Sequence, residues 1–148
     1  AVLTLFIEAV AETGSTNADL VARLRGGEAL AEGYWLRADR QTAGRGRRGR
    51  TWDGPSGNMM ASSIVTLGEG DPPAASLSFV AALAVHDMLL DLLIPPLRPS
   101  CRLKWPNDVL VDGAKISGIL LEQVARSVVV GIGVNLAQAP DLPDRATT

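Results

Sequence analysis

The segment GRGRRGRTW, residues 44–52, places four arginines and three glycines close together in a chain whose formal net charge is only −2. Guanidinium groups bind carboxylate and phosphate oxygens in pairs, and glycine lets the backbone approach an anion closely. This loop therefore predicts an anion-binding site that can orient a di- or triphosphate. A solvated basic loop, or an arginine–glycine segment that tethers nucleic acid, is the alternative interpretation.

The same loop matches the G-x-G-x-x-G pattern of dinucleotide-binding folds through its three glycines. That pattern requires a helix directly after the loop and an acidic residue about twenty positions further on. Residues 50–57, RTWDGPSG, are a poor helix start, and the nearest candidates, Glu69 and Asp71, follow a predicted strand. A Rossmann site is therefore rejected. A P-loop is rejected too, because no Gly-Lys-Ser/Thr follows.

Both lysines of the chain lie in the segment KWPNDVLVDGAK, residues 104–115. A specific need for the compact ammonium group explains this clustering, and chance is the alternative. We expect Lys115 to follow a tight turn at Asp112–Gly113 and to return near the start of the preceding strand, where a lysine is costly unless it meets an anion. Asp108 is a candidate Mg²⁺ ligand, directly or through water, although Asn107 and Asp108 can equally form a simple strand-entry turn.

Composition argues against several other chemistries. One cysteine and one histidine exclude an intramolecular disulfide and a zinc site built from these residues. Catalysis centred on His86 is not expected, because this residue lies in the apolar segment 78–93. A pI near 5.3 argues against a nucleic-acid-binding surface. Because no apolar run reaches ~18 residues and the first sixteen residues lack a basic leader region, we expect no membrane partner and a cytoplasmic location.

The hydrophobic pattern predicts one α+β domain over residues 1–148, with a mixed or antiparallel sheet. A first helix is expected to begin at Ser15, Thr16 or Asn17 and to stop at Gly26–Gly27. A second helix, from about Ala74 to Leu93, is apolar on most sides and is therefore expected to be buried. The polar tail, 137–148, contains prolines and is expected to be an open end. Strands are predicted at 4–10, 33–41, 59–67, 101–106, 108–111, 114–122 and 128–136.

Four segments, taken in order, resemble the biotin protein ligases: GSTN, RQTAGRGRRGRTW, KWPNDVLVDGAKISGILLE and VVVGIGVNL. The resemblance covers about residues 12–136. It implies the class II synthetase-like fold, in which helices flank a central mixed β-sheet. It also implies a two-step reaction with ATP and Mg²⁺: the carboxylate of biotin attacks the α-phosphate of ATP to give biotinyl-5′-AMP, and a lysine of a biotin carboxyl carrier protein then attacks this anhydride.

The resemblance also assigns roles to residues. The catalytic group would be Lys115, Arg45 and Arg47. The metal ligand would be Asp108, a candidate that rests on the segment 104–115 and not on the resemblance. Nucleotide contacts would come from Arg45, Arg47, Lys104, Trp105, Asn107 and Asn135. Biotin contacts would come from Ser15, Thr16, Asn17, Gln41, Gly44, Arg45, Gly46, Arg47, Lys115 and Gly118.

The chain departs from the usual pattern of this family at both ends. It starts at the catalytic domain, so the N-terminal DNA-binding domain of bifunctional members, and with it DNA binding, is not expected. Members usually continue into further helices and a small C-terminal β-barrel, so we expect the usual C-terminal part to be lacking. A homodimer through a sheet edge is possible. The alternatives are a lipoate or octanoate ligase of the same fold, a non-catalytic biotin-binding remnant and, less favoured, a nucleic-acid-binding module.

Overall fold

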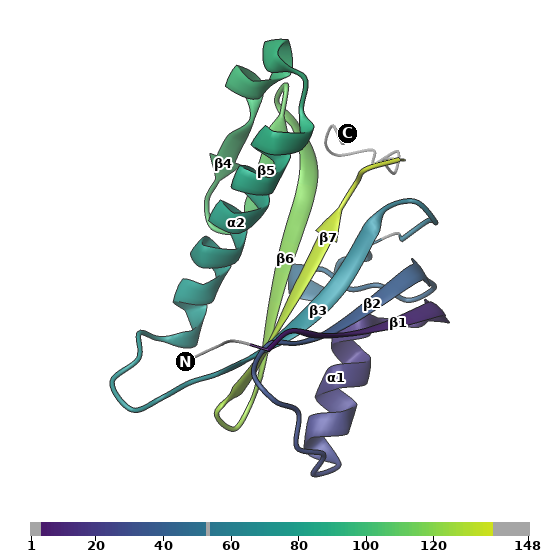
Figure 1. The fold of residues 1–148 in the computed structure, drawn as a ribbon, viewed down its shortest axis with the longest axis vertical. Coiled ribbons are helices and arrows are strands. Elements are labelled where there is room, and N and C mark those ends of the chain that lie inside the picture. Colours follow the sequence, from purple (N-terminus) through teal and green to yellow (C-terminus); the bar gives the residue numbers. More distant parts are fainter. Residues whose placement is uncertain (1–3, 53, 138–148) are drawn as a thin grey trace.

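The computed structural model describes residues 4–52 and 54–137 and contains a seven-stranded sheet flanked by helices (Figure 1). The strand order is β1-β2-β3-β7-β6-β5-β4, and only the β1–β2 pair is parallel. The expected α+β fold with a central mixed sheet is therefore confirmed. Residues 138–148 of the predicted tail lie outside the described residues. In chain order the elements are β1 (Phe6–Thr13), α1 (Thr16–Arg25), β2 (Tyr34–Gln41), η1 (Arg47–Gly49), β3 (Met59–Thr66), η2 (Ala74–Ser76), α2 (Leu77–Leu92), η3 (Pro95–Ser100), β4 (Arg102–Lys104), β5 (Asp108–Val111), β6 (Ala114–Val124) and β7 (Ser127–Val134).

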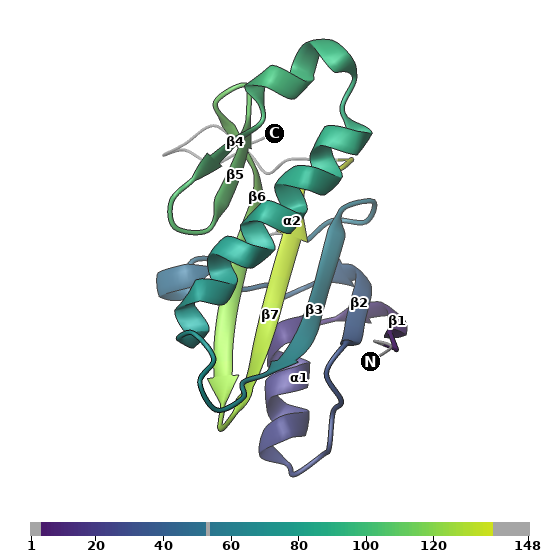
Figure 2. The same ribbon diagram turned by 60° about the vertical axis from the view of Figure 1, so that its left-hand side comes forward.

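The two α-helices cover opposite faces of the sheet. Successive side chains of a strand point to opposite faces, and β7 supplies both cores. Val129 belongs to the cluster beneath α1, together with Leu20 and Ile64. Val128 and Val130 belong to the larger cluster beneath α2. Figure 2 shows α2 crossing one face of the sheet while α1 lies behind it.

Helix α1 begins and ends where its capping residues predict. Ser15 Oγ accepts a hydrogen bond from the Ala18 backbone N–H at 3.3 Å, and Gly26 is the C-cap residue. Such an N-cap contributes about 1 kcal/mol to helix stability. It also fixes the first turn, so that Thr16 and Asn17 are held buried against the sheet.

Helix α2 is only partly buried, so the expectation of a helix buried on most sides is wrong. The helix packs on the sheet through one stripe, formed by Ala81, Ala82, Val85 and Leu89. These positions share one side of a 3.6-residue period. The side that faces away from the sheet exposes large apolar side chains, including Phe79, Val80 and Leu83.

Among the described residues, the segment Ala74–Leu92 is long and apolar enough, by length and composition, to cross a membrane. The expectation that no segment could span a membrane is therefore wrong when length and mean hydropathy are the criteria. A count of uninterrupted apolar residues misses the segment because His86, Asp87 and Asp91 interrupt it. One such helix is weak evidence for a membrane, since the core helix of a globular domain passes the same test.

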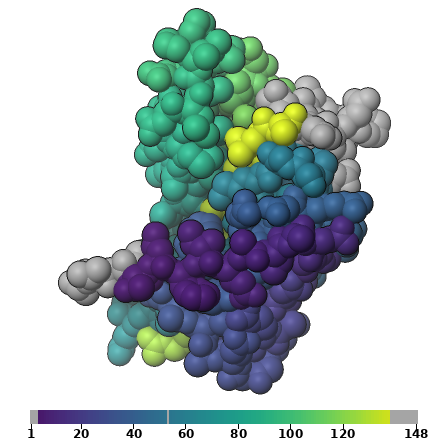
Figure 3. All heavy atoms as spheres, turned by 45° about the vertical axis from the view of Figure 1, so that its right-hand side comes forward, coloured from purple at the N-terminus to yellow at the C-terminus, as the bar shows by residue number. Residues whose placement is uncertain are grey.

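The sheet has two edge strands, β1 and β4. Figure 3 shows β1, in purple, running across the surface of the molecule. Phe6 and Ile7 at the start of β1 are exposed, as is Leu5 before it. The unpaired backbone groups of such an edge remain available for pairing with another strand.

Candidate functional site

A cavity of about 280 Å³ lies on the face of the sheet that α1 covers. Strands β6 and β7, the start of α1, the glycine–arginine loop after β2 and the β4–β5 turn all contribute to its lining. Gly44, Lys104 and Asn135, also predicted as site residues, do not line it. The predicted residues that do line it are Ser15, Thr16, Asn17, Gln41, Arg45, Gly46, Arg47, Trp105, Asn107, Asp108, Lys115 and Gly118.

A buried polar network forms one end of the cavity. Gln41 Oε1 accepts the Thr16 backbone N–H at 2.8 Å and lies 3.0 Å from Thr16 Oγ1. Thr16 Oγ1 lies 2.7 Å from Ser62 Oγ, which in turn lies 2.6 Å from Asn17 Oδ1. Segments far apart in sequence are thus joined by Thr16, Asn17 and Ser62, which are almost fully buried, and by Gln41, which is partly buried.

This network has fewer hydroxyl protons than oxygen–oxygen contacts that need one. Three oxygen–oxygen contacts depend on the hydroxyls of Thr16 and Ser62, which supply one proton each. The backbone N–H of Thr16 keeps the Gln41 amide oxygen as an acceptor, so an amide flip does not correct the shortage. This end of the cavity is therefore suited to a ligand that donates N–H hydrogen bonds.

The glycine–arginine loop folds back over the cavity and is held by two of its arginines. Arg45 Nη2 lies 3.2 Å from both carboxylate oxygens of Glu122. Arg47 Nη1 donates to Asn107 Oδ1 at 3.0 Å, and Asn107 Nδ2 donates to the Ile119 carbonyl at 2.6 Å. Arg48 takes a left-handed backbone conformation, φ 58°, inside the short helix η1. The predicted loop thus contains a single helical turn that directs several guanidinium groups toward the cavity.

A β-bulge places Lys115 in the cavity. Residues 115 and 118 would point to opposite faces of a regular strand. The pairing with β5 shifts so that Leu110 faces Lys115 while Val109 faces Ser117, which leaves Ile116 as an extra residue. Lys115 Nζ consequently lies only 3.3 Å from where a Cβ on Gly118 would be. The predicted return of Lys115 to the strand mouth therefore depends on this bulge.

Lys115 forms an ion pair with Asp108 at 2.7 Å, and the two side chains are only 13% and 17% exposed. Asp108 therefore serves as the partner of this lysine. Among the described residues, no group of three or more His, Cys, Asp or Glu side chains is arranged to hold a metal ion. One carboxylate fits Mg²⁺ only if phosphate oxygens and water supply the remaining ligands.

Trp52 is a site residue that the sequence analysis missed. Gly118 of β6 and Gly133 of β7 are register partners and form a flat platform beneath its indole ring. A Cβ would lie 2.9 Å from the ring at Gly118 and 2.7 Å from Trp52 Cζ2 at Gly133. Lys115 Nζ lies 5.6 Å from the ring centroid, within cation–π range. Glycines inside two neighbouring strands were the available signal, because they often mark a close approach.

Ser62 and Glu122 were also missed, and each has a sequence signal. Ser62 is a fully buried polar residue within the apolar strand β3. Glu122 is a charged residue near the end of the mostly apolar strand β6. Both signals are weak alone, because surface strands commonly carry such residues.

The predicted residues outside the cavity have other surroundings. A side chain at Gly44 would collide with backbone and side-chain atoms at the base of the loop, including Gln41 Nε2 at 2.7 Å. Lys104 is exposed on β4. Asn135 is buried at the end of β7, and its Nδ2 has no hydrogen-bond partner in the part of the chain that the structure describes.

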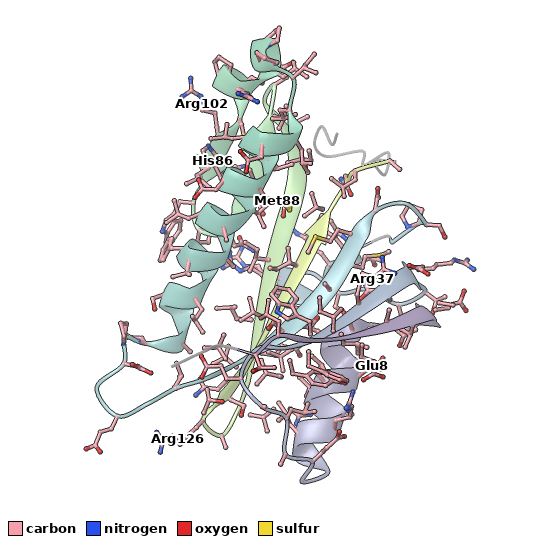
Figure 4. All side chains as sticks on the ribbon, viewed as in Figure 1. Glu8, Arg37, His86, Met88, Arg102 and Arg126 are labelled. Atoms are coloured by element: carbon pink, nitrogen blue, oxygen red, sulfur yellow. The ribbon has the colours of Figure 1, made fainter. Side chains whose placement is uncertain are left out.

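The histidine and the cysteine lie away from the cavity. His86 projects from α2, on the opposite face of the sheet from α1 (Figure 4), and its ring contacts Asp87 at 3.4 Å. Cys101 is packed in the core beneath α2, where burial raises the pKa of its thiol. Neither side chain lines the cavity.

Comparison with known proteins identifies a family model that matches residues 13–138, the biotin/lipoate A/B protein ligase family. A biotin–[acetyl-CoA-carboxylase] ligase from Paracoccus denitrificans is 47% identical over 89% of this chain and 55% of its own. One from Mycobacterium tuberculosis is 44% identical over 96% of this chain and 53% of its own. The chain therefore spans about half the length of these relatives.

A solved structure gives the same fold. The biotin protein ligase from Leishmania major in complex with biotinyl-5-AMP superposes with a TM-score of 0.81. It is 32% identical, and the match covers 96% of this chain and 62% of that one. The sheet and helices described above therefore share the fold of that protein.

Proposed function

This chain belongs to the biotin/lipoate A/B protein ligase family, and on that premise we propose that it is the catalytic domain of a biotin ligase. In this proposal the enzyme activates biotin with ATP as biotinyl-5′-AMP and transfers it to a lysine of a biotin carboxyl carrier protein. One observation carries the proposal: a single cavity joins a donor-poor polar network to a group of arginines and a lysine. Biotin has the matching polarity, with ureido N–H groups at one end and a carboxylate at the other.

The cavity provides separate surroundings for the parts of biotin. The ureido N–H groups would donate to the surplus acceptors of Thr16, Gln41 and Ser62. The apolar ring system would lie against the platform of Gly118 and Gly133, beside Trp52. A mostly apolar cavity with a few well-placed polar groups is typical of small-molecule sites.

The first reaction brings two anions together. A carboxylate oxygen of biotin attacks the α-phosphorus of ATP, the new C–O–P bond forms, and the bond to the pyrophosphate leaving group breaks. The main catalytic task is charge neutralisation and alignment, since the attacking carboxylate has no proton to lose. In the proposal Lys115, Arg45 and Arg47 perform this task. When no ligand is bound, each is held in position by one partner: Asp108 for Lys115, Glu122 for Arg45 and Asn107 for Arg47.

The nucleotide would lie against the β4–β5 turn. Trp105 is 78% exposed at the cavity and offers an aromatic surface. Asn135 Nδ2 is a buried donor without a partner among the described residues, and because Asn135 does not line the cavity, its contact to the nucleotide remains a prediction from the resemblance. Mg²⁺ would be held mainly by phosphate oxygens, with Asp108 as the available carboxylate, and would neutralise phosphate charge. Lys104 remains a predicted nucleotide contact.

The proposal extends to partners and location. The carrier protein would present its lysine at the open side of the cavity. A reaction that consumes ATP requires a compartment that supplies it, and we propose the cytoplasm. A homodimer would use a sheet edge, and gel filtration tests whether a dimer forms.

The decisive experiment combines titration calorimetry with an assay for pyrophosphate release. We expect tight biotin binding, and pyrophosphate release that requires both biotin and Mg-ATP. Binding of lipoate or octanoate in place of biotin would select the related acyl ligases. Biotin binding without pyrophosphate release would select a binding domain, and oligonucleotide binding without biotin binding would refute the proposal.

A further inference from the structure

Glu122 connects the polar network to the glycine–arginine loop. It lies on the same face of β6 as Gly118 and Leu120, because alternate residues share a face. Its carboxylate accepts a hydrogen bond from Asn17 Nδ2 at 2.9 Å and lies 3.2 Å from Arg45 Nη2 through both oxygens. The side chain is 28% exposed. The Glu122 carboxylate therefore contacts both the polar network, through Asn17, and the glycine–arginine loop, through Arg45.

The contact with Asn17 sets the direction of the buried hydrogen bonds. A carboxylate only accepts, as does the Leu120 carbonyl that lies 3.4 Å from the same nitrogen, so the amide nitrogen of Asn17 must face Glu122 and the amide oxygen must face Ser62. Ser62 must then donate to Asn17, and it can only accept from Thr16. The proton of Thr16 is thereby used, and its contact with Gln41 is the one that lacks a proton.

The contact with Arg45 holds the loop. Among the described residues, this is the one ion pair that the glycine–arginine loop forms with the rest of the chain. Arg45 is also the residue expected to meet the anionic part of the ligand. A bound anion and Glu122 would therefore share or compete for the same guanidinium group.

We propose that Glu122 is a positioning residue for the small-molecule site, an inference that rests on the proposed function. Its carboxylate fixes which oxygens of the polar network accept hydrogen bonds from the ligand. The same carboxylate anchors Arg45, so that the loop lies over the cavity before the ligand arrives.

The first test measures biotin affinity by calorimetry. Glu122→Ala should weaken binding roughly tenfold or more, because the buried Asn17 amide loses its shorter hydrogen bond and keeps only the one to the Leu120 carbonyl at 3.4 Å. Glu122→Gln should restore affinity to within about threefold, because a glutamine oxygen still accepts from Asn17. The matched control is Glu12→Gln, which removes a similar ion pair to Arg40 at 2.9 Å between two residues that do not line the cavity. The biotin affinity of this control should equal that of the unmodified chain. Unchanged affinity in Glu122→Ala, or equal losses in both Glu122 variants, would overturn the hydrogen-bond role.

The second test measures the rate of tryptic cleavage in the loop, without ligand. Loss of the Arg45 anchor should speed cleavage roughly threefold in both Glu122 variants, the scale of an exposed ion pair, and leave Glu12→Gln unchanged. Equal rates in all proteins would overturn the anchoring role. If the unmodified chain does not bind biotin, the proposed function fails, while the cleavage rates still decide whether Glu122 holds the loop.

Discussion

Replacing Lys115 with methionine separates the structural role of this lysine from its chemical role. The variant keeps the length of the side chain but leaves Asp108 as an unpaired carboxylate that is only 17% exposed. Breaking a buried ion pair by removing one partner costs about 3–5 kcal/mol, and partial exposure places this pair near the lower limit. We therefore expect Lys115→Met to lower the free energy of unfolding by about 3 kcal/mol, measured by urea denaturation.

The double variant Lys115→Met with Asp108→Asn should recover most of that loss, to within about 1 kcal/mol, because no buried charge remains. Its pyrophosphate release should nevertheless stay about 10²-fold below that of the unmodified chain, since a donor to the reacting anions is missing. Arg37→Met is the control, because it breaks an ion pair to Asp39 that is about half exposed on both sides and should cost less than about 1 kcal/mol. Near-normal pyrophosphate release in the folded double variant would refute the catalytic assignment, and a double variant as unstable as the single one would refute the ion-pair reasoning.

Three further predictions follow from the surroundings of other residues. Gly133→Ala should displace the Trp52 indole and weaken biotin binding roughly tenfold, which titration with tryptophan emission measures; an unchanged affinity would contradict the platform. Ser62→Ala should weaken biotin binding about fivefold in calorimetry through the loss of one network hydroxyl, and an equal affinity would show that the network does not contact the ligand. A hydrogen bond from the Tyr34 hydroxyl lowers the pKa of Glu8, which lies on β1 next to α1 (Figure 4), so its stabilising effect is present above about pH 4.5 and is lost as the pH falls further. Glu8→Gln should therefore lower stability at neutral pH, by less than about 1 kcal/mol because the side chain is 39% exposed, and the difference from the unmodified chain should vanish in urea titrations near pH 3.

Local chemistry was enough to predict α1 and most strands. Ser15 and Gly26 are capping residues whose roles depend on a few neighbouring backbone groups, so the sequence alone narrows the helix start to residues 15–17 and its end to residues 26–27. The hairpin between β5 and β6 follows from Asp112–Gly113, both of which take positive φ. The burial of α2 was predicted wrongly, because a mean apolar composition does not specify which side of a helix meets the sheet.

Much of the candidate site was predicted because its polar residues are unusual in their segments. The anion-binding loop and Lys115 were identified in this way, and both line the cavity. Trp52, by contrast, is placed by contacts with Gly118 and Gly133, which are distant in sequence and adjacent only in the folded sheet. Such contacts depend on strand register, and composition does not determine strand register.

The bulge at Ile116 makes the chemistry of this domain depend on the length of a hairpin as well as on its residues. If β6 paired with β5 without the bulge, Ile116 would face Leu110 and Lys115 would face Val111, which would turn the ammonium group of Lys115 to the face under α2. A sequence variant in which a change of hairpin length enforced that pairing would keep every side chain of the site and still be inert. Changes in segment length between Asp108 and Gly118 therefore deserve as much weight as substitutions when related sequences are judged for activity.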